Sequence, residues 1–101
     1  MKKAKVKAGD GFSVLLKKSR SEAAAMVLGE GEATGGPDSR HEQSDQWMYV
    51  ISGEATAKVG GSDMTLSPGD LLLIEKGETH EIRNSGKAPF KTLNIYVPPA
   101  Y

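Results

Sequence analysis

The chain has 101 residues, enough for one domain around a single modest hydrophobic core and too few for two cores. Its 13 basic and 13 acidic residues cancel, so no overall charge attracts nucleic acid or a membrane, and we expect neither as a partner. The absence of cysteine excludes disulfides, thiolate metal sites and a cysteine nucleophile.

Hydrophobic residues occur only in short runs. None approaches the roughly 18 residues that a membrane-spanning helix needs. The lysines among the first seven residues are not followed by the apolar segment of a secretory signal. We therefore expect a cytoplasmic protein in which residues 1–101 form one domain, with residues 1–11 as a basic N-terminal arm or edge strand.

Short apolar or alternating segments predict about eight strands and no helix. The predicted strands cover residues 12–17, 22–28, 46–51, 55–59, 63–66, 71–74, 80–84 and 90–97. The three alanines at 23–25 favour a helix by propensity, but Gly29 and Gly31 end the run within one or two turns, so a strand is predicted there. Residues 29–45 are polar and glycine-rich and are predicted to form a long loop. Many short strands with close turns indicate an all-β sandwich or barrel.

The most informative stretch runs from Gly69 to Asn84. A turn, the apolar segment 71–74 and a second turn at Gly77 lead into a strand that begins near His80. Because side chains alternate along a strand, His80 and Asn84 share one face. A histidine just past a glycine turn, on the inward side of a small β-domain, is suited to a metal or substrate site.

This stretch resembles the second conserved motif of the cupin superfamily, which reads glycine, five residues, proline, one residue, glycine, two residues, histidine, three residues, asparagine. Gly69, Gly77, His80 and Asn84 fall at the family spacing, whereas Glu75 stands at the proline position. The resemblance implies a double-stranded β-helix, the jelly-roll barrel of cupins.

The first cupin motif, glycine, five residues, His-x-His, three or four residues, glutamate, six residues, glycine, is matched in part. Counting back from Gly53 places Gln46 at the glutamate position, His41 at the second histidine position and Ser39 at the first. In metal-binding cupins these positions and the histidine of the second motif surround one divalent ion. The resemblance therefore implies His41, Gln46 and His80 as ligands of Fe, Mn, Ni or Zn.

The departures from the motif weaken this set. Glutamine keeps an oxygen donor but lacks the negative charge of glutamate, so it attracts a dication less strongly. Serine at position 39 is a poor ligand unless it is ionised. The carboxylates of Glu42 and Asp45 could compensate, and Gln43 could replace Gln46 if the loop is not extended.

Alternation along residues 46–51 separates two faces. If Gln46 faces the barrel interior, Met48 lines the same pocket, for which Ser39 and Gln43 are further candidates. Trp47 and Tyr49 then point outward, where large aromatic side chains favour a homodimer interface. Packing beneath a neighbouring strand or loop is the alternative. Two tyrosines further along the chain, at 96 and 101, could extend such an interface.

Two hypotheses of function follow. In the first, the barrel pocket binds a divalent metal through His41, Gln46 and His80 and binds or acts on a small oxygen-rich molecule. The resemblance leaves open whether the protein is an enzyme and, if so, whether it is a metal-dependent oxygenase, isomerase or lyase. In the second, the same three residues hydrogen-bond a sugar or small acid in a non-catalytic, metal-free binding module.

Overall fold

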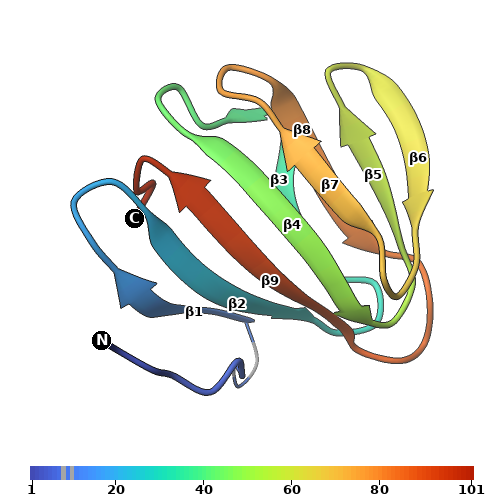
Figure 1. The fold of residues 1–101 in the computed structure, drawn as a ribbon. Helices are drawn as coiled ribbons and strands as arrows, with labels where there is room; N and C mark the ends of the chain where they lie inside the picture. The colour runs from blue at the N-terminus through green and yellow to red at the C-terminus, as the bar shows by residue number, and fades with distance from the viewer. Residues whose placement is uncertain (8, 10) are drawn as a thin grey trace.

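The fold consists of two antiparallel sheets that face one another, as Figure 1 shows for the computed structural model. The structure describes residues 1–7, 9 and 11–101, and of residues 36–40 it describes the backbone alone. The strands are β1 Gly11–Lys17, β2 Glu22–Leu28, β3 Ala33–Arg40, β4 Asp45–Ser52, β5 Ala55–Val59, β6 Ser62–Leu66, β7 Leu71–Ile74, β8 Thr79–Asn84 and β9 Phe90–Val97. No helix occurs in the described part of the chain. The all-β prediction is confirmed.

Both sheets are interleaved in sequence, as a jelly roll requires. The larger sheet has the order β1-β2-β9-β4-β7 and the smaller one the order β3-β8-β5-β6. Every pair is antiparallel, and successive strands alternate repeatedly between the two sheets. This connectivity closes the sheets around one interior, the double-stranded β-helix that the sequence predicts.

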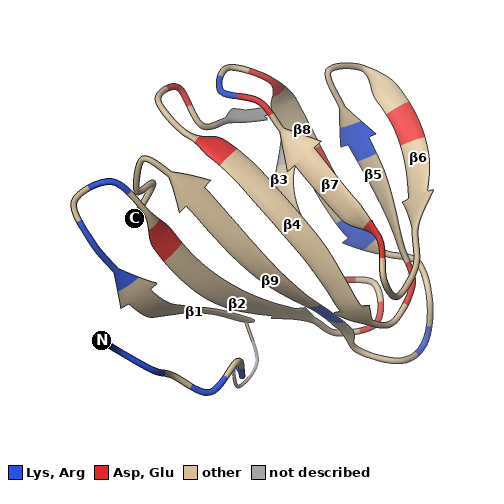
Figure 2. Cartoon of the chain, viewed as in Figure 1, with Lys and Arg blue, Asp and Glu red and all other residues tan. Residues whose placement is uncertain are grey.

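The core fills the space between the sheets. It is formed by inward-facing residues of seven strands, namely Met26, Leu28, Met48, Val50, Ala55, Ala57, Val59, Leu66, Ile74, Ile82 and Phe90. Charged residues are scattered over loops and strand ends and are sparse along β4, β7 and β9 (Figure 2). Buried polar side chains also lie in this interior, among them Gln46, His80, Thr92 and Asn94.

One expectation about the elements is wrong. Residues 29–45, predicted to be a long loop, contain β3. Its residues pair with β8 near Ala33 and again at Arg40, with an irregularity between them. Glycine and proline make this strand unrecognisable from composition, because both residues are depleted in strands. Long-range pairing with β8 overrides that local preference.

The segment with the alanine run is a strand, as predicted. Strand β2 lies between β1 and β9 and pairs with β9 along its whole length. Its small side chains at Ala24 and Ala25 are buried. Pairing on both sides thus outweighs the helical preference of alanine. Before β1, residues 1–7 form no strand.

Candidate functional site

Two turns hold the predicted site residues at one end of the barrel. His80 is the second residue of β8, and His41 follows β3 directly. The turn before β8 contains Gly77 in the left-handed region, at φ 82°, where glycine is favoured. Its amide donates to the backbone oxygen of His41 at 2.8 Å. This bond ties the loop that carries one histidine to the turn that precedes the other.

Glu75 stands at the position where the cupin motif has proline, and it takes part in hydrogen bonds that stabilise the same turn. The Glu75 amide donates to the Glu78 carboxylate at 2.8 Å, and the Glu78 amide donates back to the Glu75 backbone oxygen at 3.0 Å. A proline at position 75 has no N–H and could not make the first bond. The turn that places His80 is therefore stabilised here by hydrogen bonds in place of a proline ring.

The two imidazoles lie side by side. Their ring centroids are 5.1 Å apart, with an angle of 31° between the ring planes. His80 is 8% exposed, and its Nδ1 lies 3.4 Å from the backbone oxygen of Glu78. A proton on Nδ1 can be donated to that oxygen, which leaves Nε2 as a free lone pair.

Both imidazoles are held in the neutral form that binds metals. Burial lowers the pKa of His41, the nearby His80 lowers it further, and the Gln46 side chain opposes the shift. Burial also lowers the pKa of His80, against the effect of its contact with Glu78. At neutral pH the pair therefore offers nitrogen lone pairs.

Gln46 faces the barrel interior from β4, as the alternation predicts. It is 4% exposed, and its Nε2 donates to Asn94 Oδ1 at 3.4 Å. The side chain is close enough to affect the pKa of His41, but within the described part of the chain its Oε1 has no partner of normal hydrogen-bond geometry. A buried amide oxygen without a partner is costly and is an expected feature of a site that receives a ligand.

Sequence reasoning missed the polar interior of β9. Thr92 and Asn94 are fully buried, and the Thr92 hydroxyl donates to Asn94 Oδ1 at 3.3 Å. The Nδ2 of Asn94 is buried and has no partner in the part of the chain that the structure describes. The sequence emphasised the apolar face of Leu93 and Ile95, but those residues are only partly buried and face outward. The signal in the sequence was the alternation of Thr92 and Asn94 with apolar residues, which allows either set to face inward.

Aromatic rings surround His41. Tyr96 lies 5.2 Å from it and Tyr101 lies 5.6 Å from it, both edge-on and measured between ring centroids. Tyr96 is only 2% exposed, so the suggestion that it extends an outer interface is wrong. Burial, Tyr101 and Glu22 all raise the pKa of Tyr96, and its ring lies edge-on to the Tyr101 ring, 5.2 Å away between centroids. The phenols therefore stay neutral beside the imidazole pair.

The structure places the remaining predicted site residues differently from one another. Met48 is buried in the interior as predicted, whereas Gln43 is exposed. The side chain of Ser39 lies outside the described residues. Among the side chains that the structure describes, no group of three histidine, cysteine, aspartate or glutamate residues could hold a metal. Asp45 instead accepts a hydrogen bond from the Lys76 amide at 2.9 Å, so it does not complete the donor set.

Asn84 of the second motif has a structural role. Its Nδ2 donates to the backbone oxygens of Leu28 and Ala88, both at 2.9 Å, and its Oδ1 accepts from the Gly86 amide at 2.8 Å. The side chain thereby joins the end of β2 to the loop between β8 and β9. It shares a face with His80 but orders the opposite end of the strand.

A hollow of about 270 Å³ opens beside His41, with Ser44, Pro99 and Ala100 in its lining. Two larger hollows, of about 400 and 420 Å³, lie on the outer face of β5, β6 and β8 and between residues 1–2 and the β1–β2 hairpin. Neither contains a histidine. Of these three hollows, only the one beside His41 is lined by a histidine, and His80 is not part of its lining.

Comparison with known families agrees with this architecture. Residues 24–96 match the family model described as Cupin domain. The chain belongs to the cupin family. The match covers β2 to β9 nearly completely and includes both histidines.

Two curated relatives and one solved structure illustrate the likeness. The Tetracenomycin polyketide synthase protein TcmJ of Streptomyces glaucescens is 28% identical over 88 residues, covering 84% of this chain and 59% of that protein. The Oxalate-binding protein of Thermotoga maritima is 28% identical over 74 residues, covering 73% of this chain and 60% of that protein. This cupin thus spans about three-fifths of the length of both relatives.

The structure of BH2720 from Bacillus halodurans superposes on this cupin with a TM-score of 0.86 at 24% identity, covering 91% of this chain and 73% of that one. A likeness at this identity shows the shared fold alone. Within the described residues of this cupin, no helix has the length and apolar character needed to cross a membrane.

Proposed function

We propose that this cupin binds a divalent metal ion at the end of its barrel through His41, Gln46 and His80, and binds a small oxygen-rich molecule there. The observation that carries the proposal is the meeting of the two imidazoles, 5.1 Å apart between ring centroids, beside a buried amide oxygen that has no partner among the described residues. Two neutral imidazoles and one oxygen form a donor set suited to Fe, Mn, Ni or Zn.

The donor chemistry fits such an ion with moderate affinity. His80 can donate its Nδ1 proton to the backbone oxygen of Glu78. A metal-binding histidine is usually oriented by a hydrogen bond of this kind from its other ring nitrogen. The three donors carry no negative charge, so the attraction for a dication is weaker than with glutamate at position 46. A bound ion would supply Lewis acidity. The chain's own part is to hold neutral imidazoles and to present the Asn94 amide donor toward a ligand oxygen.

The test is metal binding by untagged protein prepared without chelator. Mn²⁺, Fe²⁺, Ni²⁺ and Zn²⁺ should each be titrated while heat release and melting temperature are followed, and at least one should bind at one ion per chain. His41→Ala and His80→Ala should abolish that binding with the fold retained, whereas Gln43→Ala, at an exposed neighbouring position, should not. Failure of all four ions to bind or stabilise the protein would end the metal proposal.

A second candidate is a metal-free binding module for a sugar or small acid. It is favoured by the absence of a carboxylate from the described donor set and by the unpartnered Asn94 donor and Gln46 acceptor. The printed name of one relative, the Oxalate-binding protein, indicates a small acid as the first ligand to try. Thermal stabilisation by oxalate in excess chelator would support this candidate, and stabilisation that requires metal would exclude it.

We also propose that the outer face of the larger sheet forms a homodimer interface. Trp47 is 41% exposed and pairs across strands with Leu73, and Tyr49 pairs with Leu71. Exposed apolar side chains on adjacent strands with little charge between them favour association (Figure 2). Sedimentation at micromolar concentration should give a dimer that Leu73→Lys dissociates. A monomeric wild-type protein would contradict the interface.

A further inference from the structure

The segment 98–101 lies across the end of the barrel beside the imidazole pair. It follows β9, and in Figure 1 the chain turns there toward β2 and the loop after β1. Pro99 and Ala100 form part of the wall of the hollow at His41. The Tyr101 ring packs edge-on against His41 and lies 4.6 Å from the Phe12 ring, measured between centroids. This segment therefore covers the outer side of the site.

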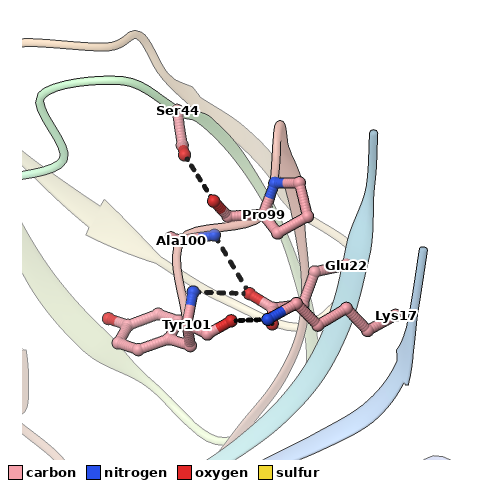
Figure 3. A network of polar contacts seen from close by, with 6 residues as sticks. All are labelled: Lys17, Glu22, Ser44, Pro99, Ala100 and Tyr101. Carbon is pink, nitrogen blue, oxygen red and sulfur yellow. Dashed lines mark hydrogen bonds and ion pairs between the residues drawn. The ribbon is translucent and has the colours of Figure 1, made fainter. Parts of the chain in front are cut away.

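A buried carboxylate holds the segment in place. Glu22 is 1% exposed, and its Oε1 accepts hydrogen bonds from the amides of Ala100 at 3.1 Å and Tyr101 at 2.9 Å (Figure 3). Its Oε2 lies 3.7 Å from Lys17 Nζ, which also donates to the backbone oxygen of Tyr101. Hydrogen bonds to an ionised acceptor are roughly twice as strong as neutral ones.

Further contacts fix the two ends of the segment. The Ser44 hydroxyl donates to the Pro99 backbone oxygen at 3.4 Å, which joins the segment to the loop that carries His41. The Tyr101 ring packs edge-on against the Tyr96 ring, with 5.2 Å between the centroids. Glu22 lies on β2, far in sequence from the imidazoles, and touches neither of them in any described contact. Its buried charge is therefore directed to the backbone of the covering segment.

We propose that Tyr101 bounds the imidazole site and limits access to it, and that Glu22, with Lys17, is the positioning residue that holds Tyr101 over His41. The inference extends the proposed function, because it concerns access to the same two histidines. It predicts that ligands reach His41 when Tyr101 moves away, and that the size of residue 101 sets the size of molecule admitted. Neither role is contained in the two cupin motifs.

Histidine modification by diethyl pyrocarbonate tests access without any metal. The protein has two histidines, both at the site, so carbethoxylation of untagged protein reports the site alone. Burial keeps both imidazoles neutral, the reactive form. Tyr101→Ala keeps the backbone hydrogen bonds of residue 101 but removes the ring that packs on His41, and it should raise the rate of His41 modification about tenfold, the size expected for loss of an aromatic contact. Tyr101→Phe keeps the ring and should react at nearly the wild-type rate.

The positioning residues have their own matched variants. Glu22→Gln should raise the rate, and Glu30→Gln, at an exposed position, should not. Because Glu22 is buried and its variant could fail to fold, Lys17→Met provides the same test at an exposed position, with Lys18→Met as its control. Circular dichroism and the melting temperature establish that each compared variant is folded.

The results separate this inference from the proposed function. Faster modification in Tyr101→Ala and Lys17→Met, with Tyr101→Phe, Glu30→Gln and Lys18→Met unchanged, supports the inference even if no metal binds. A Tyr101→Ala rate within about twofold of wild type overturns it, whatever the metal titrations give. Equal acceleration in Tyr101→Phe and Tyr101→Ala would likewise overturn the role of the ring.

Discussion

Gln46→Glu tests the charge of the imidazole site. The substitution replaces a buried amide with a carboxylate of nearly the same shape, at a position where the cupin motif has glutamate. No described residue donates a hydrogen bond to the amide oxygen of Gln46. The carboxylate oxygen that replaces it would therefore be free to bind a cation. We expect tighter metal binding and a less stable metal-free protein.

The magnitude follows from two opposing terms. At about 4 Å and an effective dielectric constant of about 20, a carboxylate attracts a dication by about 8 kcal/mol, twice the value for two unit charges. Burying the carboxylate costs several kcal/mol, because residue 46 has almost no contact with solvent. In the wild-type protein Asn94 Oδ1 accepts a hydrogen bond from Gln46, and the substitution replaces that donor with a second acceptor. A net gain of about 2–3 kcal/mol corresponds to roughly 30- to 150-fold tighter binding.

Calorimetric titration with the best-bound ion measures this gain against a matched control. Gln43→Glu adds the same charge to the neighbouring loop, but its side chain is exposed and solvent screens it, so the affinity should change less than about threefold. In chelator, Gln46→Glu should melt at a lower temperature than wild type, by about 4–8 °C for each kcal/mol lost. Added metal should reverse that loss.

Two results would refute the reasoning. If Gln46→Glu and Gln43→Glu bind metal equally well, residue 46 is not a ligand. If Gln46→Glu is as stable as wild type in chelator, the carboxylate has found solvent and residue 46 does not face the interior as described. A lower melting temperature together with unchanged affinity would leave Gln46 as a structural residue.

Three further predictions concern the frame of the site. Asn84→Ala should lower the free energy of unfolding by about 2–4 kcal/mol in urea, because it leaves buried backbone oxygens without donors. Gly53→Ala should be at least about 2 kcal/mol more destabilising than Gly61→Ala: both residues have positive φ, but a Cβ at Gly53 would lie 2.4 Å from the Pro89 backbone oxygen, whereas Gly61 has open space. The pKa of His80 is lower in the folded protein than in the unfolded chain, where it is about 6.5. The stability that neutral His80 contributes is therefore complete above about pH 6.5 and is lost as the pH falls toward the pKa of the folded state. Melting temperature in chelator should therefore fall less between pH 7 and 5 for His80→Asn than for wild type; an equal fall would contradict the depressed pKa.

Most of the fold could be predicted from local patterns. Turn residues and short alternating runs placed eight of the nine strands, and the spacing from Gly69 to Asn84 indicated the cupin barrel. Strand β3 could not be found in this way, because its glycines and proline disfavour a strand and only pairing with β8 stabilises one. A pattern within one segment carries no information about a partner about fifty residues away.

The site was predictable where motif spacing applied and unpredictable elsewhere. His41, Gln46 and His80 were expected together, and the structure brings both imidazoles into contact and turns Gln46 inward. Asn94 was missed because β9 presents an apolar face outward and a polar face inward, the reverse of the usual alternation. Glu22 was missed because an isolated glutamate next to an alanine run resembles a surface residue until the chain returns beside it.

The interior amides connect the two candidate functions. Asn94 Oδ1 accepts from Gln46 and from Thr92, and among the described residues the amide N–H of Asn94 and the amide oxygen of Gln46 remain unpaired. Turning both amides by 180° reverses their bond, yet it again leaves one donor and one acceptor unpaired. A cation uses the acceptor and leaves the donor for a ligand oxygen, whereas a small acid or hydroxyl group can use both. A small acid therefore satisfies both members of the buried pair, whereas a cation alone satisfies only the acceptor. The affinity of Asn94→Leu for oxalate in chelator, compared with its affinity for metal alone, separates the two: loss confined to oxalate indicates the metal-free role, because Asn94 is not among the proposed metal ligands.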